Sequence, residues 1–141
     1  MSHKTPVRPR CLQDFEGGWE LIRRIEHADG TLARFEGLSI WAPDGDGLCQ
    51  EESGVLRIGK AAPIVARRRY LWRPILSVHF DDGRFFHDVP STGGKASHWC
   101  APDQYDVTYD FAPWPEFRVT WQVSGPRKSY RMDSIYRRIS A

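Results

Sequence analysis

The ionisable side chains that could form a binding site alternate with apolar residues along short, strand-like stretches. If Gly59-Lys60-Ala61 is a three-residue hairpin loop, the register of the two flanking strands follows, and Glu52 lies opposite Arg68. The same register pairs Gln50 with Tyr70 on this otherwise apolar face, so all four side chains are expected to point inward. A buried ion pair is costly. Glu52 and Arg68 therefore form either a structural clamp or a site in which Arg68 is available to an anionic ligand.

A histidine on the next hairpin is the second candidate. Asp82-Gly83 is a strong signal for a two-residue turn, which places His87 and Phe85 inside the fold and His79 and Phe86 outside. An imidazole among apolar residues is either a hydrogen-bonded core residue or a group that serves a ligand. The pairs that this turn predicts are Phe80 with Phe85, Val78 with His87, and Leu76 with Val89.

The expected interior holds more polar side chains than a purely structural core needs. Each buried polar atom requires a partner, and a bound ligand with ordered water would supply it. Arg23 could add a second guanidinium, but the register of the first two strands leaves its side open. The residues predicted to bind a ligand are Glu52, Arg68, Tyr70, His87, His98, Tyr109, Trp121 and Tyr130.

The same groups permit an enzymatic alternative. His87 or His98 could act as general base and a tyrosine such as Tyr109 as acid, as in an isomerase, dehydratase or cyclase. A metal centre is not expected, because the spacing of His87, His98 and Cys100 matches no standard zinc pattern. Cys100 beside His98 also lacks any sign of an oxyanion hole, and no cofactor is expected. The sequence leaves open whether the protein is an enzyme.

About ten short strands separated by turn signals must position these side chains. Asp29-Gly30 and Pro43-Asp44-Gly45-Asp46-Gly47 are two such turns. The alternation is clearest in residues 105–111 and 117–123, where every second position is aromatic or aliphatic. The pattern predicts an all-β fold, a single antiparallel up-and-down β-barrel.

Residues 1–14 are expected to form an N-terminal arm, and residues 15–141 the barrel domain. The inward faces carry Gly54, Ala66 and Ser134 where a filled barrel would carry larger side chains. The barrel is therefore predicted to be hollow.

Composition narrows the expected partners. The 141 residues carry a net charge of only +2 without a basic run, so nucleic-acid binding is not expected. A membrane role is not expected either, because no apolar run is long enough to span a bilayer and Met1–Arg10 does not resemble a signal peptide. Three cysteines without metal-type spacing indicate free thiols and a cytoplasmic location. The expected partner is a small molecule, and the oligomeric state is left open.

Five segments stand out as a set: Phe15-Glu16-Gly17-Gly18-Trp19, Arg68-Arg69-Tyr70-Leu71-Trp72, Asp82-Gly83-Arg84-Phe85-Phe86-His87, His98-Trp99-Cys100-Ala101-Pro102-Asp103-Gln104-Tyr105 and Gly125-Pro126-Arg127-Lys128-Ser129-Tyr130. Together they resemble an uncharacterised, largely bacterial family of unknown function, over nearly the whole chain. The resemblance implies a lipocalin-like (calycin) barrel and brings no catalytic residue with it.

A wider similarity is to lipocalins and fatty-acid-binding proteins, whose opening Gly-x-Trp matches Gly17-Gly18-Trp19. It implies that Trp19 plugs one end of the barrel and that a closing arginine, Arg138 or Arg137, packs on its indole. The Arg-x-Tyr carboxylate clamp of the fatty-acid binders is not present, because Tyr136-Arg137-Arg138 reverses the order.

Three functional hypotheses remain at this point. The first is a barrel that binds a partly aromatic, anionic small molecule, with Arg68 and Glu52 recognising charge. The second is an enzyme of the same shape. The third is a filled barrel that acts as an interaction module through its loops at residues 43–47 and 90–95. A cavity would separate the first two from the third.

Overall fold

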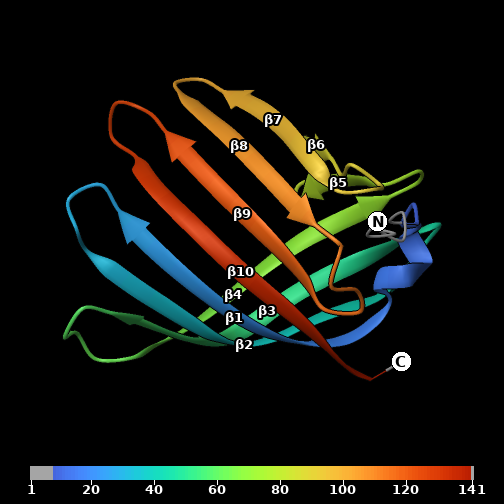
Figure 1. Cartoon of the computed structure of the whole chain (residues 1–141), viewed down its shortest axis with the longest axis horizontal. Coiled ribbons are helices and arrows are strands. Elements are labelled where there is room, and N and C mark those ends of the chain that lie inside the picture. The colour runs from blue at the N-terminus through green and yellow to red at the C-terminus, as the bar shows by residue number, and fades with distance from the viewer. Residues whose placement is uncertain (1–7, 141) are drawn as a thin grey trace, which may run out of the picture.

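The computed structural model describes residues 8–140 and shows one ten-stranded antiparallel sheet that curls into a nearly closed barrel (Figure 1). Within this range, strands that are neighbours in sequence pair with each other except β6 and β7, which form the two edges, while β1 pairs with β10. The all-β, up-and-down architecture predicted from the sequence is confirmed. The strands are β1 Gly17–His27, β2 Leu32–Asp44, β3 Gly47–Ile58, β4 Ile64–Arg73, β5 Ser77–Phe80, β6 Phe85–Asp88, β7 Gly94–Cys100, β8 Asp103–Asp110, β9 Phe117–Ser124 and β10 Ser129–Ser140.

The segment before β1 contains a short 3-10 helix, η1, over Leu12–Phe15. Residues 1–7 of the predicted arm lie outside the described residues. No helix in the described part of the chain is both long and apolar enough to cross a membrane.

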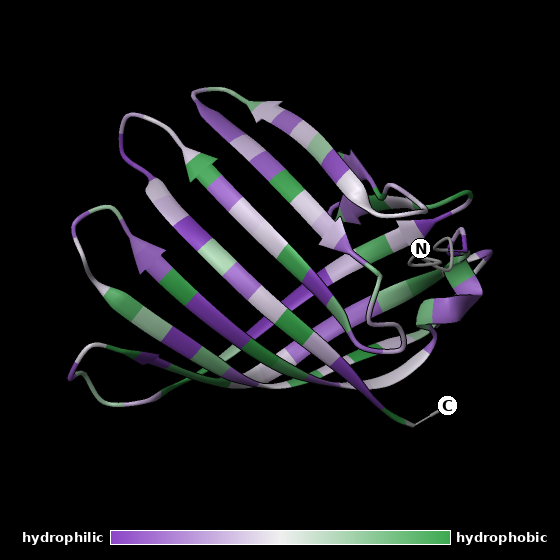
Figure 2. Ribbon diagram, in the orientation of Figure 1, coloured by the Kyte–Doolittle hydropathy of each residue, from purple (hydrophilic) through white to green (hydrophobic). Residues whose placement is uncertain are grey.

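Hydrophilic and hydrophobic residues alternate along the strands, as Figure 2 shows. In β8, Val107 and Tyr109 are buried in the barrel, whereas Asp106 and Asp110 are exposed. This period of two turns one row of side chains toward the interior and the other toward solvent.

The register between β3 and β4 agrees with the sequence-based prediction. Gln50 is opposite Tyr70, Glu52 is opposite Arg68, and Gly54 is opposite Ala66. A hairpin register fixes the face of every residue in both strands. The inward rows of these two strands are therefore those expected.

The register between β5 and β6 differs from the prediction at one point. Val78 pairs with His87 as expected, but a β-bulge then pairs His79 with Phe85, and the amide of Phe80 donates to the carbonyl of Arg84 at 2.8 Å. The bulge adds one residue to β6. Phe86 is therefore buried next to His87, and Phe85 is half exposed, which reverses the predicted faces of these two phenylalanines.

Trp19 closes one end of the barrel. Its indole is 0% exposed and donates through Nε1 to the carbonyl of Phe15 at 2.9 Å. The guanidinium of Arg138 lies 4.1 Å from the centre of the indole ring and also bonds to the carbonyls of Asp14 and Glu16. The expected packing of a closing arginine on Trp19 is confirmed, and Arg138 is the residue that provides it.

Two facing glycines bring β2 and β3 unusually close together. Gly37 is opposite Gly54, and a Cβ added to either one would lie 2.0 Å or 2.2 Å from a backbone oxygen of the facing strand. Such a gap admits only hydrogen at Cα. Strand approach therefore explains Gly54, rather than the need to leave the interior empty.

Candidate functional site

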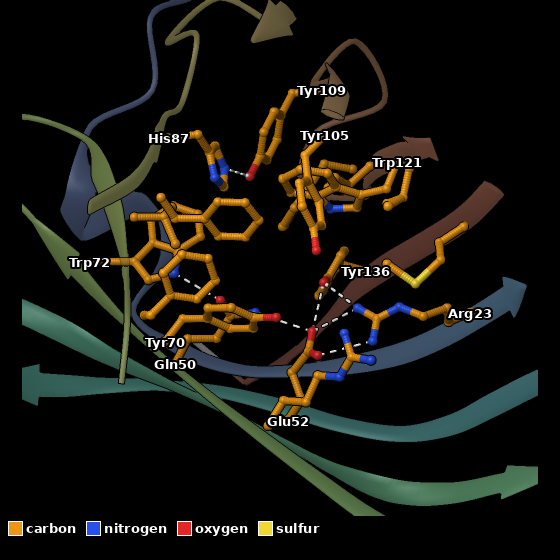
Figure 3. Close-up of a pocket in the computed structure, with 18 of the residues that line it drawn as sticks. Arg23, Gln50, Glu52, Tyr70, Trp72, His87, Tyr105, Tyr109, Trp121 and Tyr136 are labelled. Atoms are coloured by element: carbon orange, nitrogen blue, oxygen red, sulfur yellow. Dashed lines mark hydrogen bonds and ion pairs between the residues drawn. The ribbon is translucent and has the colours of Figure 1, made fainter. Parts of the chain in front are cut away.

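A cavity of about 270 Å³ lies inside the barrel (Figure 3). The predicted hollow is thus present, just below the roughly 300–1,000 Å³ typical of small-molecule sites. Its walls are largely aromatic. Of the residues predicted to bind a ligand, those that line it are Glu52, Arg68, Tyr70, His87, Tyr109, Trp121 and Tyr130.

His98 is the one predicted ligand-binding residue that does not line the cavity. It is only partly buried and packs edge-on against the ring of Phe86, with centroids 5.4 Å apart. Phe86 itself stacks on Trp121 and Phe80 at 5.0 Å and 4.4 Å. The bulge in β6 thus places Phe86 in the cavity wall. His98 contacts Phe86 but does not line the cavity.

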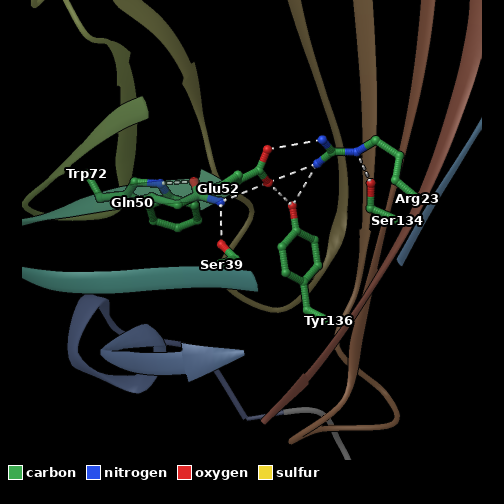
Figure 4. Close-up of polar contacts among 7 residues, drawn as sticks. All are labelled: Arg23, Ser39, Gln50, Glu52, Trp72, Ser134 and Tyr136. Atoms are coloured by element: carbon green, nitrogen blue, oxygen red, sulfur yellow. Dashed lines mark hydrogen bonds and ion pairs between the residues drawn. The ribbon is translucent and has the colours of Figure 1, made fainter. Parts of the chain in front are cut away.

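A buried ion pair lies inside the barrel, but its cation is Arg23 rather than the predicted Arg68 (Figure 4). Nη1 and Nη2 of Arg23 donate to the two carboxylate oxygens of Glu52 at 3.0 Å and 2.9 Å. Arg23 comes from β1 and Glu52 from β3, so the pair ties two parts of the sheet together. The alternation of β1 from the buried Trp19 is the sequence signal that places Arg23 inside.

Hydroxyl groups complete this ion pair. Nε of Arg23 donates to the hydroxyl of Ser134 at 2.7 Å, and Nη2 donates to that of Tyr136 at 3.2 Å. The Tyr136 hydroxyl in turn donates to Glu52 at 2.8 Å. Every buried charge in the pair is therefore hydrogen-bonded, which is the condition under which such a pair is tolerated.

A second chain of hydrogen bonds extends from Glu52 along the cavity wall (Figure 4). The amide of Gln50 donates to Glu52 at 3.3 Å and to Ser39 at 3.2 Å. The indole of Trp72 donates to the side-chain oxygen of Gln50 at 2.8 Å. Gln50 thereby fixes the orientation of an aromatic wall residue relative to the ion pair.

The ion pair stays charged in the folded protein. Burial alone would lower the pKa of Arg23, but the charge of Glu52 and the Tyr136 hydroxyl outweigh it, so this pKa lies above its ordinary value. Burial alone would raise the pKa of Glu52, but the charge and hydrogen bonds of Arg23 keep it below its ordinary value. The negative charge of Glu52 is thus balanced by Arg23 and is not available to pair with a ligand.

Arg68 has a different position from the one predicted. Its backbone is opposite Glu52, yet its side chain is exposed and has no ion-pair partner among residues 8–140. The physical reason is that Arg23 already binds both oxygens of Glu52. Arg68 nevertheless lines the cavity, on the side of the long β3–β4 hairpin. The turns at residues 28–31, 59–63, 101–102 and 125–128 lie together at the end of the barrel opposite η1 and the Trp19 plug. We call this end the mouth.

Lys128 brings a second cation to the mouth. Its Nζ donates to the hydroxyl of Tyr105 at 3.5 Å and lies 3.6 Å from the carboxylate of Asp103. Lys128, Tyr105 and Tyr130 all line the cavity. Sequence analysis named Tyr130 here and missed Lys128, because a lysine in a turn gives no sign of the wall it approaches.

His87 forms the second polar centre, on the other side of the cavity from Glu52 (Figure 3). It is 3% exposed, and its Nε2 lies 2.8 Å from the hydroxyl of Tyr109. Burial, with a smaller effect of the charge of His98, lowers the pKa of His87 to about 3. Burial also raises the pKa of Tyr109 above its ordinary value. Imidazole and phenol are therefore both neutral at physiological pH.

The low pKa of His87 predicts a loss of stability in mild acid. The unfolded chain binds a proton at its ordinary pKa near 6.5, whereas the folded chain does not until about pH 3. The contribution of His87 to the free energy of unfolding is therefore fully present above pH 6.5. It falls as the pH drops through this window, by roughly 2 kcal/mol between pH 7 and pH 5. Urea unfolding at both pH values should show this loss.

Two glutamine variants, one a test and one a control, check that His87 is the titrating group. His87→Gln removes the titrating group and should lose roughly 2 kcal/mol less than the parent between pH 7 and pH 5. His79→Gln is the control, because the imidazole of His79 contacts the carbonyl of Gly83 at an exposed site. This variant should behave like the parent. Equal acid sensitivity of the parent and His87→Gln would contradict the assignment.

The described residues contain no group of three or more His, Cys, Asp or Glu side chains that could hold a metal ion. Cys11, Cys49 and Cys100 are free thiols.

Comparison with known families adds to this picture. A sequence model for one family matches residues 15–138. The chain belongs to the family of unknown function DUF6314. No curated protein matches it.

Two solved structures resemble the barrel of this DUF6314 protein. The S-type phycobiliprotein lyase CPES from Guillardia theta has a TM-score of 0.58 and 10% sequence identity, over 92% of this chain and 91% of that one. A de novo designed fluorescence-activating β-barrel has a TM-score of 0.44 and 16% identity, over 90% of this chain and 95% of that one. At this identity the likeness to the lyase shows a shared lipocalin-like fold.

Proposed function

We propose that this DUF6314 protein binds a small organic anion built on one or two aromatic rings, with the rings inside the barrel and the anionic group at the mouth. The volume of about 270 Å³ suits a molecule of that size. The walls present stacked rings, among them Phe86, Trp121 and Tyr70. Flat aromatic walls favour flat aromatic ligands through apolar burial and offset stacking.

The unpaired guanidinium of Arg68 is the observation that carries the proposal. It lines the cavity and forms no ion pair within the described residues, and its charge has only a minor effect on Glu52, which binds the buried Arg23 directly. Lys128 approaches the same cavity from the β9–β10 turn. An anionic group at the mouth would meet both cations, and arginine suits carboxylates because its donors form a planar fork.

The other two hypotheses have less support. A general base works best with a pKa near the operating pH, and that of His87 is about 3, while His98 does not reach the cavity. The filled-barrel hypothesis loses its premise because the interior is hollow. One of the two loops that this hypothesis requires to be free is also partly covered. The loop at residues 90–93 lies against the N-terminal segment, where the amide of Arg10 donates to the carbonyl of Ser91 at 2.7 Å.

Paired naphthalene probes test the proposal. By titration calorimetry at pH 7, 2-naphthoate should bind and the uncharged 2-naphthamide should bind more weakly. Arg68→Gln should weaken 2-naphthoate about twofold to fivefold, as expected for one charged contact at a solvent-exposed rim, and leave 2-naphthamide unchanged.

Arg69→Gln is the matched control, because it removes the same charge from the same strand on the outer face. It should bind both probes like the parent. Equal binding of the two probes by the parent, or equal effects of the two arginine substitutions, would overturn the proposal.

A further inference from the structure

Two cavity-lining residues have a buried side-chain nitrogen without a hydrogen-bond partner among the described residues, Trp41 at Nε1 and His87 at Nδ1. The indole Nε1 can only donate, whereas the imidazole Nδ1 can donate or accept. Nδ1 of His87 is fully buried, and none of the described residues donates to it or accepts from it. His87 lines the cavity, and its other nitrogen is occupied by Tyr109. Buried polar atoms are almost always hydrogen-bonded, so Nδ1 of His87 has a real deficit. A ligand group would meet it by displacing part of the aromatic cover that Phe86 and Trp121 now provide.

The His87–Tyr109 pair can present either kind of hydrogen-bonding atom. When the Tyr109 hydroxyl donates to Nε2, the proton of the neutral imidazole is on Nδ1, which then donates. When Nε2 carries the proton and donates to Tyr109, Nδ1 accepts. The rings of Phe86 and Trp121 pack edge-on against the imidazole at 4.7 Å and 5.0 Å and hold its plane in place.

This atom lies deeper in the barrel than the cations of the mouth. His87 pairs with Val78, and Val78 pairs with Trp72, which is four residues beyond Arg68 on β4. At about 3.3 Å per residue these two rows are about 13 Å apart along the strand. Trp72 also contacts Phe15 at the closed end, with centroids 4.9 Å apart.

The wall formed by β8 shows the same order, with a cation near the mouth and the hydrogen-bonding group nearer the closed end. Tyr109, the partner of His87, is four residues along β8 from Tyr105, whose hydroxyl accepts from Lys128. Beyond Tyr109, Phe111 contacts Phe15 at 5.9 Å, so the closed end is again on the Tyr109 side. Both walls therefore place a cation toward the mouth and a neutral hydrogen-bonding group deeper inside.

We propose that the ligand carries a second polar group, neutral and at the opposite end of its ring system from its anionic group, which forms a hydrogen bond with Nδ1 of His87. A hydroxyl, a carbonyl or a ring nitrogen would serve. The inference rests on the proposed function, since the anionic group at the mouth sets the orientation of the ligand. A second anionic group is disfavoured at this depth, because the imidazole and the phenol around it are buried and neutral.

Two probes that differ by one hydroxyl test the inference. By calorimetry at pH 7, the parent should bind 6-hydroxy-2-naphthoate roughly tenfold more tightly than 2-naphthoate, as one hydrogen bond to an otherwise unpaired buried atom predicts. His87→Phe keeps an aromatic ring and removes both nitrogens, so it should bind the two probes equally. His79→Phe should keep the preference of the parent.

A second measurement does not depend on a variant that folds. In long-range ¹H–¹⁵N spectra of the parent, the His87 Nδ1 resonance should move with 6-hydroxy-2-naphthoate and remain nearly unchanged with 2-naphthoate. Binding of both probes without a hydroxyl preference, a preference that survives in His87→Phe, or an unmoved Nδ1 resonance would overturn this inference and leave the proposed function intact. If neither naphthoate binds, or if Arg68→Gln has no effect, both proposals fail.

Discussion

Replacing Glu52 by glutamine should lower the free energy of unfolding by about 3–5 kcal/mol, the usual cost of removing one partner of a buried ion pair. Glu52 accepts from both terminal nitrogens of Arg23 and from the hydroxyl of Tyr136. The amide can accept some of these hydrogen bonds, but it leaves the Arg23 guanidinium buried without a counter-ion. Urea unfolding at pH 7 measures the loss.

A double variant separates the charge from the packing. Arg23→Met with Glu52→Leu removes both charges and should recover most of the stability, because well-packed apolar pairs commonly replace buried ion pairs at little net cost. Glu51→Gln is the control, since Glu51 is the exposed neighbour of Glu52 on the outer face, and it should change stability by less than about 0.5 kcal/mol. If Glu52→Gln unfolds with the parent, the clamp contributes nothing.

The same double variant tells the clamp apart from the ligand site. The ion pair is complete within the protein, with the guanidinium matched by Glu52, Ser134 and Tyr136. The double variant should therefore fold and still bind 2-naphthoate better than 2-naphthamide. Arg68→Gln should show the opposite pattern, with parental stability and weaker binding of the anion. Loss of the anion preference in the double variant would assign the anion to Arg23 instead.

The fold was predictable because turn signals and a period of two act locally. The loop after Ile58 determines the register of a whole hairpin. The derived pairs from Leu48 with Trp72 to Leu56 with Ile64, including Glu52 with Arg68, are present, while the predicted pair of Ile58 with Ala62 is not part of the ladder. A bulge is harder to foresee. The one in β6 depends on Phe86 finding space between Phe80 and Trp121, which involves a strand far away in the sequence.

The candidate site was predictable in its composition but not in its pairing. Register places Arg68 opposite Glu52, yet cross-strand opposition in one hairpin does not exclude a third strand. Arg23 reaches Glu52 diagonally over β2, the strand between β1 and β3, and that contact depends on the curl of the sheet rather than on the register of one hairpin. Ser134 and Tyr136 on β10 then favour Arg23 over Arg68, because only Arg23 lies within reach of their hydroxyl groups.

The aromatic plug at the closed end leads to the second large effect. Trp19→Ala should lower the free energy of unfolding by about 3–5 kcal/mol, within the range for truncating a large buried aromatic residue. The substitution empties a site that is 0% exposed, removes the hydrogen bond to Phe15 and leaves Arg138 without its ring. If it prevents folding altogether, Trp19→Phe keeps part of the packing and should fold with a smaller loss.

Trp99→Ala is the matched control for the plug, because it makes the same chemical change at an indole that is 62% exposed. It should shift the urea midpoint little. Arg138→Met tests the cation separately. In a double-mutant cycle with Trp19→Leu, which removes the ring, the coupling should be about 0.5–1 kcal/mol, as expected for a cation stacked on an indole at a partly exposed site. Equal losses for Trp19→Ala and Trp99→Ala would show that the barrel does not depend on its plug. A coupling of zero would show that Arg138 acts only through the carbonyls of Asp14 and Glu16, which it also contacts.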